Sequence, residues 1–212
     1  MRILAISGSL RAASSNTSAL KAIALIAPPG IEVALYDGLA TLPHFNPDLD
    51  VDAAPEPVRT LRKEIGACDG LLISSPEYAH GVAGSLKNAL DWLVSSVEFP
   101  GKPVAIINAS PRAVHADAQL REILNTMSAR LVEPACISLP LLGRNLDAAA
   151  IAADADLSAT LLGVLESLSQ ATAEVAERAP DRRYGHFTTG GSEERIDSTL
   201  PPVRNPKIVP RS

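Results

Sequence analysis

Short runs of consecutive apolar residues alternate along the chain with longer segments in which apolar residues recur every three or four positions. A fully apolar short run is typical of a strand buried on both faces, whereas the periodic pattern is typical of a helix with one buried side. The runs predict strands at 2–7, 31–36, 70–74, 103–107 and 135–139. The periodic segments predict helices at about 14–27, 58–65, 85–93 and 120–127, and a last helix that begins near 157 and ends near 179–180.

Strands that alternate with helices predict a parallel sheet with helices on both faces, which is a doubly wound, three-layer α/β/α architecture. The 212 residues are enough for one such domain with a large core. From about Asp181 the composition changes, because prolines, adjacent glycines and charged residues replace the periodic apolar pattern. We therefore expect a domain at 1–180 and a tail at 181–212, which is either flexible or an arm that wraps another subunit.

Composition and charge narrow the class of protein. The net charge of −5 argues against a nucleic-acid partner, which usually needs a basic face. No apolar run is long enough for a membrane span or for the core of a signal peptide. Cys68 and Cys136 each lie in an apolar stretch far from the other, which favours buried free thiols in a reducing compartment. We expect a soluble cytoplasmic protein without a membrane or nucleic-acid partner.

Three polar or glycine-containing loops follow the first, third and fourth predicted strands, at 8–17, 75–84 and 108–112. If the strand order is 2-1-3-4-5, these three strands are neighbours and their loops line one crevice. The strand order then reverses between the first and third strands, and such a reversal is where open parallel sheets bind ligands. The sequence therefore predicts a binding site at this edge of the sheet.

The first loop is suited to an anion, because it leads into a helix whose first amide groups carry partial positive charge. Its single glycine, Gly8, excludes the three-glycine dinucleotide fingerprint, and no Walker-type lysine follows. A helix cap needs one hydroxyl, so several hydroxyls together with a guanidinium favour a terminal phosphate, as on a mononucleotide or on flavin mononucleotide (FMN). The candidate binding residues are Ser9, Arg11, Ser14, Ser15, Asn16 and Thr17.

The second and third loops are suited to a flat ring. Proline stiffens the second loop, and its small residues allow the backbone to approach a ligand closely. Tyr78 offers an aromatic face or a hydroxyl, and a serine of the third loop could reach the ring from the other side. The candidate ring contacts are Pro76, Glu77, Tyr78, Ala79 and Ser110. The chain has no Ser/His/Asp or metal-ligand constellation, so we expect neither a catalytic side chain nor a metal site.

Three motifs, in this order and spacing, resemble the NADPH-dependent FMN reductases, the flavodoxin-like flavin, quinone, chromate and azo reductases. They are Gly8-Ser9-Leu10-Arg11-x-x-Ser14-x-Asn16, then Leu42-Pro43-x-Phe45-Asn46-Pro47-Asp48, and finally Pro76-Glu77-Tyr78 followed by Gly84-x-Leu86-Lys87-Asn88-Ala89-Leu90-Asp91-Trp92. The resemblance covers about residues 1–168. It implies a flavodoxin-like five-stranded sheet and assembly as a homodimer or homotetramer, with 86–92 serving packing and assembly.

The resemblance also implies a cofactor and an activity. FMN would be held through its phosphate by Ser9, Arg11, Ser14, Ser15 and Asn16, and through its ring mostly by the backbone of 76–78. Hydride would pass from NADPH or NADH through FMN to a quinone or a similar acceptor, such as a flavin, an azo dye or chromate. A non-enzymatic flavodoxin-like electron carrier and a flavin-free binding protein that keeps the fold are the alternatives.

Two departures from the family pattern concern the ring side of the predicted crevice. Ala79 and His80 follow Pro-Glu-Tyr where the family usually has asparagine, and the third loop lacks the glycines that are frequent there. A lone loop histidine is more often solvated than catalytic. Arg112 and His115 could meet the acidic parts of a nicotinamide nucleotide. The sequence therefore indicates the cofactor more firmly than the substrate.

Overall fold

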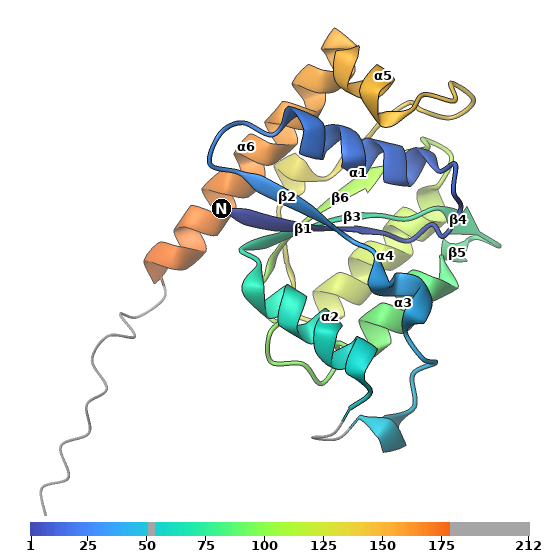
Figure 1. The fold of residues 1–212 in the computed structure, drawn as a ribbon, viewed down its shortest axis with the longest axis vertical. Helices are drawn as coiled ribbons and strands as arrows, with labels where there is room; N and C mark the ends of the chain where they lie inside the picture. Colours follow the sequence, from blue (N-terminus) through green and yellow to red (C-terminus); the bar gives the residue numbers. More distant parts are fainter. Residues whose placement is uncertain (51–53, 179–212) are drawn as a thin grey trace, which may run out of the picture. The chain divides into compact units, whose positions relative to one another are not determined.

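A parallel sheet between two layers of helices forms the fold (Figure 1), as the sequence predicts. The computed structural model describes residues 1–50 and 54–178. The strands run in the order β2-β1-β3-β6-β7, with β8 also paired to β6. Their bounds are β1 Arg2–Ser7, β2 Glu32–Tyr36, β3 Gly70–Ser74, β6 Pro103–Asn108, β7 Arg130–Leu131 and β8 Ile137–Ser138. The predicted tail, 181–212, lies outside the described residues.

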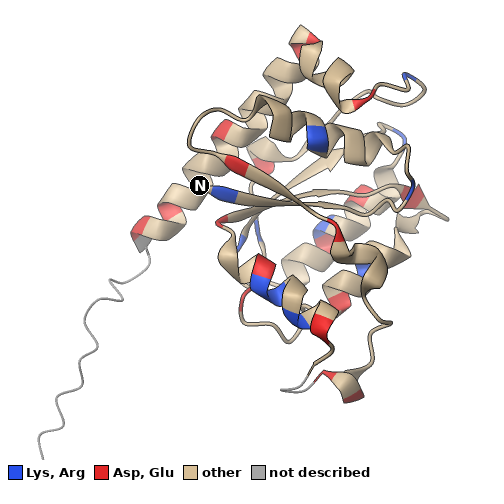
Figure 2. Ribbon diagram, in the orientation of Figure 1, with Lys and Arg blue, Asp and Glu red and all other residues tan. Residues whose placement is uncertain are grey.

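Helices cover both faces of the sheet (Figure 1), α1, α5 and α6 on one and α2, α3 and α4 on the other. The α-helices are α1 Ser15–Ile26, α2 Glu56–Ala67, α3 Gly84–Asp91, α4 Val114–Thr126, α5 Ala148–Ala153 and α6 Ala155–Arg178. Three short 3₁₀ helices are η1 Gly38–Thr41, η2 Pro47–Leu49 and η3 Glu133–Ala135. Figure 2 shows both acidic and basic residues along α2, α3 and α4.

The two apolar cores form because successive side chains of a strand point to opposite faces of the sheet. In β1, Ile3 and Ala5 pack beneath α1 and α6, whereas Leu4 and Ile6 pack against α2 and α3. Every residue of β3 is buried, which explains its unbroken apolar run. Because helices cover both faces, a ligand can reach the sheet only at the ends of its strands.

The far edge of the sheet differs from the sequence prediction. A single fifth strand was expected at 135–139, but two two-residue strands, β7 and β8, pair in turn with β6, so the sheet has six strands among the described residues. Pro134 lies in the 3₁₀ helix η3 that separates them. Because proline has no N–H to donate to a ladder, it interrupts the edge strand at this point. Helix α5 and the hairpin of β4 and β5 are also absent from the prediction.

Two of the sequence motifs form one structural unit. The Pro43 carbonyl accepts hydrogen bonds from Asn88 Nδ2 at 2.9 Å and from Trp92 Nε1 at 2.8 Å, and Asn88 Oδ1 accepts from the Phe45 N–H at 2.8 Å. The Phe45 ring meets the buried Trp92 ring edge-on, with the centroids 5.1 Å apart. The end of α3 therefore fixes the loop that precedes η2, which agrees with the packing role expected of this motif.

Both cysteines of the chain are free thiols, as the sequence analysis expects. Cys68 is buried and Cys136 half-buried, both as free thiols, and burial raises the pKa of each. Among the described residues, no helix is both long enough and apolar enough to cross a membrane.

Candidate functional site

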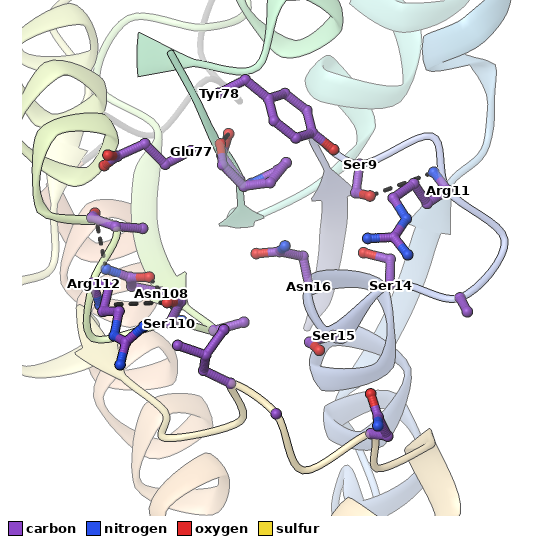
Figure 3. Close-up of a pocket in the computed structure, with 18 residues that line it drawn as sticks. Ser9, Arg11, Ser14, Ser15, Asn16, Glu77, Tyr78, Asn108, Ser110 and Arg112 are labelled. Atoms are coloured by element: carbon purple, nitrogen blue, oxygen red, sulfur yellow. Dashed lines mark hydrogen bonds between the residues drawn. The ribbon is translucent and has the colours of Figure 1, made fainter. Parts of the chain in front are cut away.

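A pocket of about 560 Å³ lies at the carboxyl edge of the sheet (Figure 3). The loops after β1, β3 and β6 line it, so the three loops singled out in the sequence do meet. Of the predicted site residues, the pocket is lined by Ser9, Arg11, Ser14, Ser15, Asn16, Pro76, Glu77, Tyr78 and Ser110. Thr17 and Ala79 do not line it.

The first turn of α1 forms one end of the pocket. Ser14 is its N-cap, and the Ser14 hydroxyl accepts a hydrogen bond from the Thr17 N–H at 3.4 Å. The amides of Ser15 and Asn16 are among those that a helix start leaves without an intrahelical acceptor. This end of the pocket therefore offers hydrogen-bond donors from these amides, the nearby hydroxyls and the Arg11 guanidinium, and it contains no carboxylate. Such a set of donors fits a phosphate group.

Gly8 allows the first loop to pass close to the neighbouring elements. Its N–H donates to the Ser74 carbonyl at 2.8 Å, and its carbonyl accepts from the Ser85 hydroxyl at 3.0 Å. A Cβ at this position would lie 3.0 Å from Ser75 Oγ and 3.3 Å from Leu86 Cβ. The single glycine of the loop is therefore explained by its close packing against Ser75 and α3. It is not part of a nucleotide-binding fingerprint.

Asn16 and Thr17 are tied into the protein. The buried Ser74 hydroxyl lies 2.8 Å from Asn16 Oδ1 and 2.6 Å from the Ile107 carbonyl, which connects α1 to β3 and β6. Thr17 Oγ1 lies 2.8 Å from Ser7 Oγ, away from the pocket lining. Asn16 is thus left with its backbone N–H and side-chain NH₂ for a ligand, and Thr17 mainly supports the loop.

A short hairpin forms the second side of the pocket. Strands β4 Glu77–Tyr78 and β5 Gly81–Val82 pair antiparallel, and the Val82 N–H donates to Gln119 Oε1 of α4 at 2.7 Å. Tyr78 is half exposed, and Figure 3 shows its ring reaching across the pocket toward Ser9. The hairpin is therefore an arm fixed to α4 that presents an aromatic ring and backbone groups to the pocket.

The two residues at the hairpin turn have left-handed backbones, with φ of 49° at Ala79 and 59° at His80. Positive φ at both central positions is the type I′ turn, which favours glycine because it has no Cβ and asparagine because its short polar side chain can hydrogen-bond locally. This turn is also where the chain departs from the family pattern. The His80 ring stacks on the His115 ring with the centroids 4.3 Å apart. Neither histidine lines the pocket.

Exchanging Ala79 for asparagine is expected to stabilise the protein by about 0.5–1 kcal/mol, because local hydrogen bonding by the asparagine side chain offsets part of the roughly 1–2 kcal/mol that a left-handed backbone costs alanine. Chemical denaturation of the two proteins measures the difference in free energy of unfolding. The control is Ala40→Asn, because Ala40 is exposed and its φ is not positive. Equal gains in both variants would contradict the strained-turn explanation.

The Glu77 carboxylate caps α4. Its Oε2 accepts hydrogen bonds from the backbone N–H groups of His115 and Ala116, each at 2.9 Å, and Figure 3 shows the carboxylate turned away from the centre of the pocket. These bonds lower the pKa of Glu77 below its ordinary value, chiefly through Ala116. The side chain therefore fixes the hairpin to α4, which leaves the backbone of 77 for a ligand.

This cap predicts a pH dependence. Because the pKa of Glu77 is lowered in the folded protein, its contribution to stability is complete above the ordinary glutamate pKa of about 4.3 and is lost as the pH falls through the lower folded-state pKa. The difference in free energy of unfolding between wild type and Glu77→Gln should therefore be largest near neutral pH and shrink in acid. A difference that stays constant from pH 7 to pH 3 would argue against the cap.

The third loop holds its own shape. The Ser110 N–H donates to Asn108 Oδ1 at 3.0 Å, Asn108 Nδ2 donates to the Ala113 carbonyl at 3.2 Å, and the Arg112 N–H donates to Ser110 Oγ at 3.3 Å. The loop therefore positions the backbone of residues 110 and 112 without help from a ligand. Asn108 and Arg112 join Ser110 in lining the pocket.

A fourth segment, which the sequence reading missed, completes the pocket. Leu142, Gly143 and Asn145 lie between β8 and α5, and all three line the pocket. Gly143 and Asn145 have φ of 76° and 48°. The signal was a Gly-x-Asn turn directly after the last predicted strand, which a parallel sheet brings to the same edge.

Comparison with known proteins identifies the family. The model of the NADPH-dependent FMN reductases matches residues 1–141, which include the loops after β1, β3 and β6. The chain belongs to this family. An NAD(P)H-dependent FMN reductase of Pseudomonas aeruginosa is 42% identical over 112 residues, which are 52% of this chain and 60% of that protein. A quinone reductase of Escherichia coli is 33% identical over 138 residues, which are 62% of this chain and 73% of that protein.

Solved structures show the same fold as this FMN reductase family member. The flavoenzyme NAD(P)H:(acceptor) oxidoreductase FerB of Paracoccus denitrificans is 27% identical, with a TM-score of 0.65 over 82% of this chain and 97% of that one. An archaeal flavodoxin, 14% identical, has a TM-score of 0.53 over 81% of this chain and 99% of that one. The flavodoxin-like α/β/α fold is thereby confirmed.

Proposed function

We propose that this protein is an FMN-dependent NAD(P)H oxidoreductase that passes hydride from NADPH or NADH to quinones or similar small acceptors, such as flavins, azo dyes or chromate. The observation that carries the proposal is a single pocket with a carboxylate-free anion site at the start of α1 and a hairpin with an aromatic ring beside it. Family membership and the names of the quinone reductase and FMN reductase relatives support it.

The residues of the pocket fit FMN in one orientation. Ser9, Arg11, Ser14, Ser15 and Asn16 would hold the phosphate, because hydroxyls, helix-start amides and a guanidinium gather at that end. The backbone of Pro76, Glu77 and Tyr78, with Ser110 opposite, would then lie beside the ring. The pocket extends from α1 to the third loop, so phosphate and ring have separate sides.

Bound FMN supplies the hydride chemistry, and the protein supplies binding and orientation. The helix start fixes one end of the cofactor through its phosphate. The hairpin, held by Glu77 and Gln119 to α4, presents rigid backbone groups to the ring. Among the described residues, no group of three His, Cys, Asp or Glu side chains is placed to hold a metal ion. The proposed reaction needs no side chain as nucleophile or base.

The test is the visible spectrum of the FMN-loaded protein under anaerobic conditions, before and after NADPH and then NADH are added. Loss of the oxidised flavin spectrum, followed by its return when benzoquinone is added, supports the proposal. Steady-state rates with NADPH and benzoquinone should then give parallel ping-pong lines. A flavin that neither nucleotide reduces would favour an electron carrier, and failure to take up FMN would favour a flavin-free binding protein.

We also propose that the protein is a homodimer or homotetramer and acts in the cytoplasm. The family resemblance in the motif at 84–92 supports the first proposal, and the two free thiols support the second. Sedimentation equilibrium of the full chain tests the assembly, since a monomer at micromolar concentration would contradict it.

A further inference from the structure

Two of the arginines whose side chains the structure describes form no ion pair. Six of the eight form ion pairs with a carboxylate, and the two that do not are Arg11 and Arg112. Both line the same pocket. The six pairs are Arg2–Glu64, Arg59–Glu56, Arg62–Asp50, Arg121–Asp117, Arg130–Glu174 and Arg144–Asp154.

The two unpaired guanidinium groups lie on opposite sides of the pocket. Figure 3 shows Arg11 beside Ser9 and Ser14 at the start of α1, and Arg112 beside Asn108 and Ser110 on the third loop. The Arg112 backbone is held by the bond from its N–H to Ser110 Oγ. Its side chain is exposed and projects from this fixed loop.

Glu77, the acidic residue that lines the pocket, already accepts hydrogen bonds from α4. Both backbone N–H groups at the start of α4 donate to Glu77 Oε2, which holds this carboxylate on α4. Arg112 therefore keeps its hydrogen-bond donors free for a ligand. Arginine presents these donors as a planar fork that matches the oxygens of a phosphate, carboxylate or sulfonate.

FMN carries one phosphate, and the donors at the start of α1 account for it. A second cation at the other side of the pocket therefore calls for a second anion that enters while FMN is bound. We propose that Arg112 forms a substrate subsite that binds the anionic group of the molecule reacting at the flavin. Two substrates can bring such a group: the phosphates of the reduced nicotinamide dinucleotide, and a carboxylate or sulfonate on the acceptor. This inference rests on the proposed function.

The test compares FMN-loaded wild type with Arg112→Gln and with the control Arg59→Gln. Arg59 lies on α2, outside the pocket, and pairs with Glu56 at the surface. Calorimetry measures the binding of NADP⁺ and of a naphthoquinone sulfonate to each protein without turnover. Loss of a charge-assisted contact should weaken one or both probes about tenfold in Arg112→Gln, leave Arg59→Gln unchanged and be partly restored by Arg112→Lys.

The pattern of losses identifies the source of the anion. Weaker NADP⁺ binding assigns Arg112 to the donor, and weaker sulfonate binding assigns it to the acceptor. The affinity for FMN should not change. The inference is overturned if Arg112→Gln binds both probes like wild type, if wild type binds neither, or if the variant loses FMN instead. An absence of NAD(P)H oxidation by wild type would refute the proposed activity, whereas the binding comparison would still decide the role of Arg112.

Discussion

Arg11→Gln is expected to bind FMN about 10- to 100-fold more weakly than wild type. The guanidinium lies at the start of α1 without a carboxylate partner among the described residues, so a ligand phosphate would be its counter-ion. Charge-assisted hydrogen bonds contribute about 1.5–3 kcal/mol, and each 1.4 kcal/mol is tenfold in affinity. Because Arg11 is exposed, the lower part of this range applies at physiological salt. Titration of the apoprotein with FMN, followed by flavin fluorescence, measures the change.

The matched control for Arg11 is again Arg59→Gln, which removes an exposed arginine from a helix that does not line the pocket. The difference between Arg11→Gln and wild type should narrow as salt is raised, since the lost interaction is electrostatic. Equal FMN affinity in wild type and Arg11→Gln at low salt would show that the phosphate does not bind at the start of α1.

Trp92→Ala is expected to lower the free energy of unfolding by about 3–5 kcal/mol, which is typical of truncating a large buried aromatic side chain. Trp92 has 0% exposure, packs edge-on against Phe45 and donates its indole N–H to the Pro43 carbonyl. The substitution removes all three contributions and loosens the loop that α3 fixes. Urea denaturation of the two proteins measures the loss, provided that the free energy of unfolding depends on urea concentration with the same slope in both.

Trp92→Phe separates packing from hydrogen bonding. The Pro43 carbonyl still accepts from Asn88 Nδ2, so the loss of the indole N–H should cost only about 1 kcal/mol beyond the loss of ring volume. Trp92→Phe should therefore be clearly more stable than Trp92→Ala. Near-equal stability of Trp92→Ala and wild type would contradict the claim that this motif anchors the loop at 42–45.

The order of strands and helices was predictable because apolar runs mark the buried strands and apolar residues at three- and four-residue steps mark the helices. The apolar run of β3 predicts a strand covered on both faces, and the structure buries all of it. The edge of the sheet was less predictable, because the 3₁₀ helix with Pro134 separates β7 from β8, and only pairing with β6 makes these two-residue segments strands. Helix α5 is six residues long and too short for a period to be seen.

The location of the candidate site was predictable because parallel strands bring their following loops to one edge. The contacts that individual side chains make at this site were less predictable. Sequence cannot show that Glu77 turns to the amides of α4, because its partners lie 38 and 39 positions away. The same holds for Thr17, which bonds Ser7, and for the contribution of Leu142 to the lining. The roles of the predicted residues toward FMN stay predictions.

The central claim is that this pocket holds FMN by its phosphate at the start of α1. The most direct measurement is a calorimetric titration of the apoprotein with FMN and, in parallel, with riboflavin, which has the same ring system but no phosphate. We predict that FMN binds at one equivalent per chain and that riboflavin binds at least about 100-fold more weakly, since the charge-assisted contacts are lost. Equal affinity for the two flavins, or no binding of FMN, would contradict the claim.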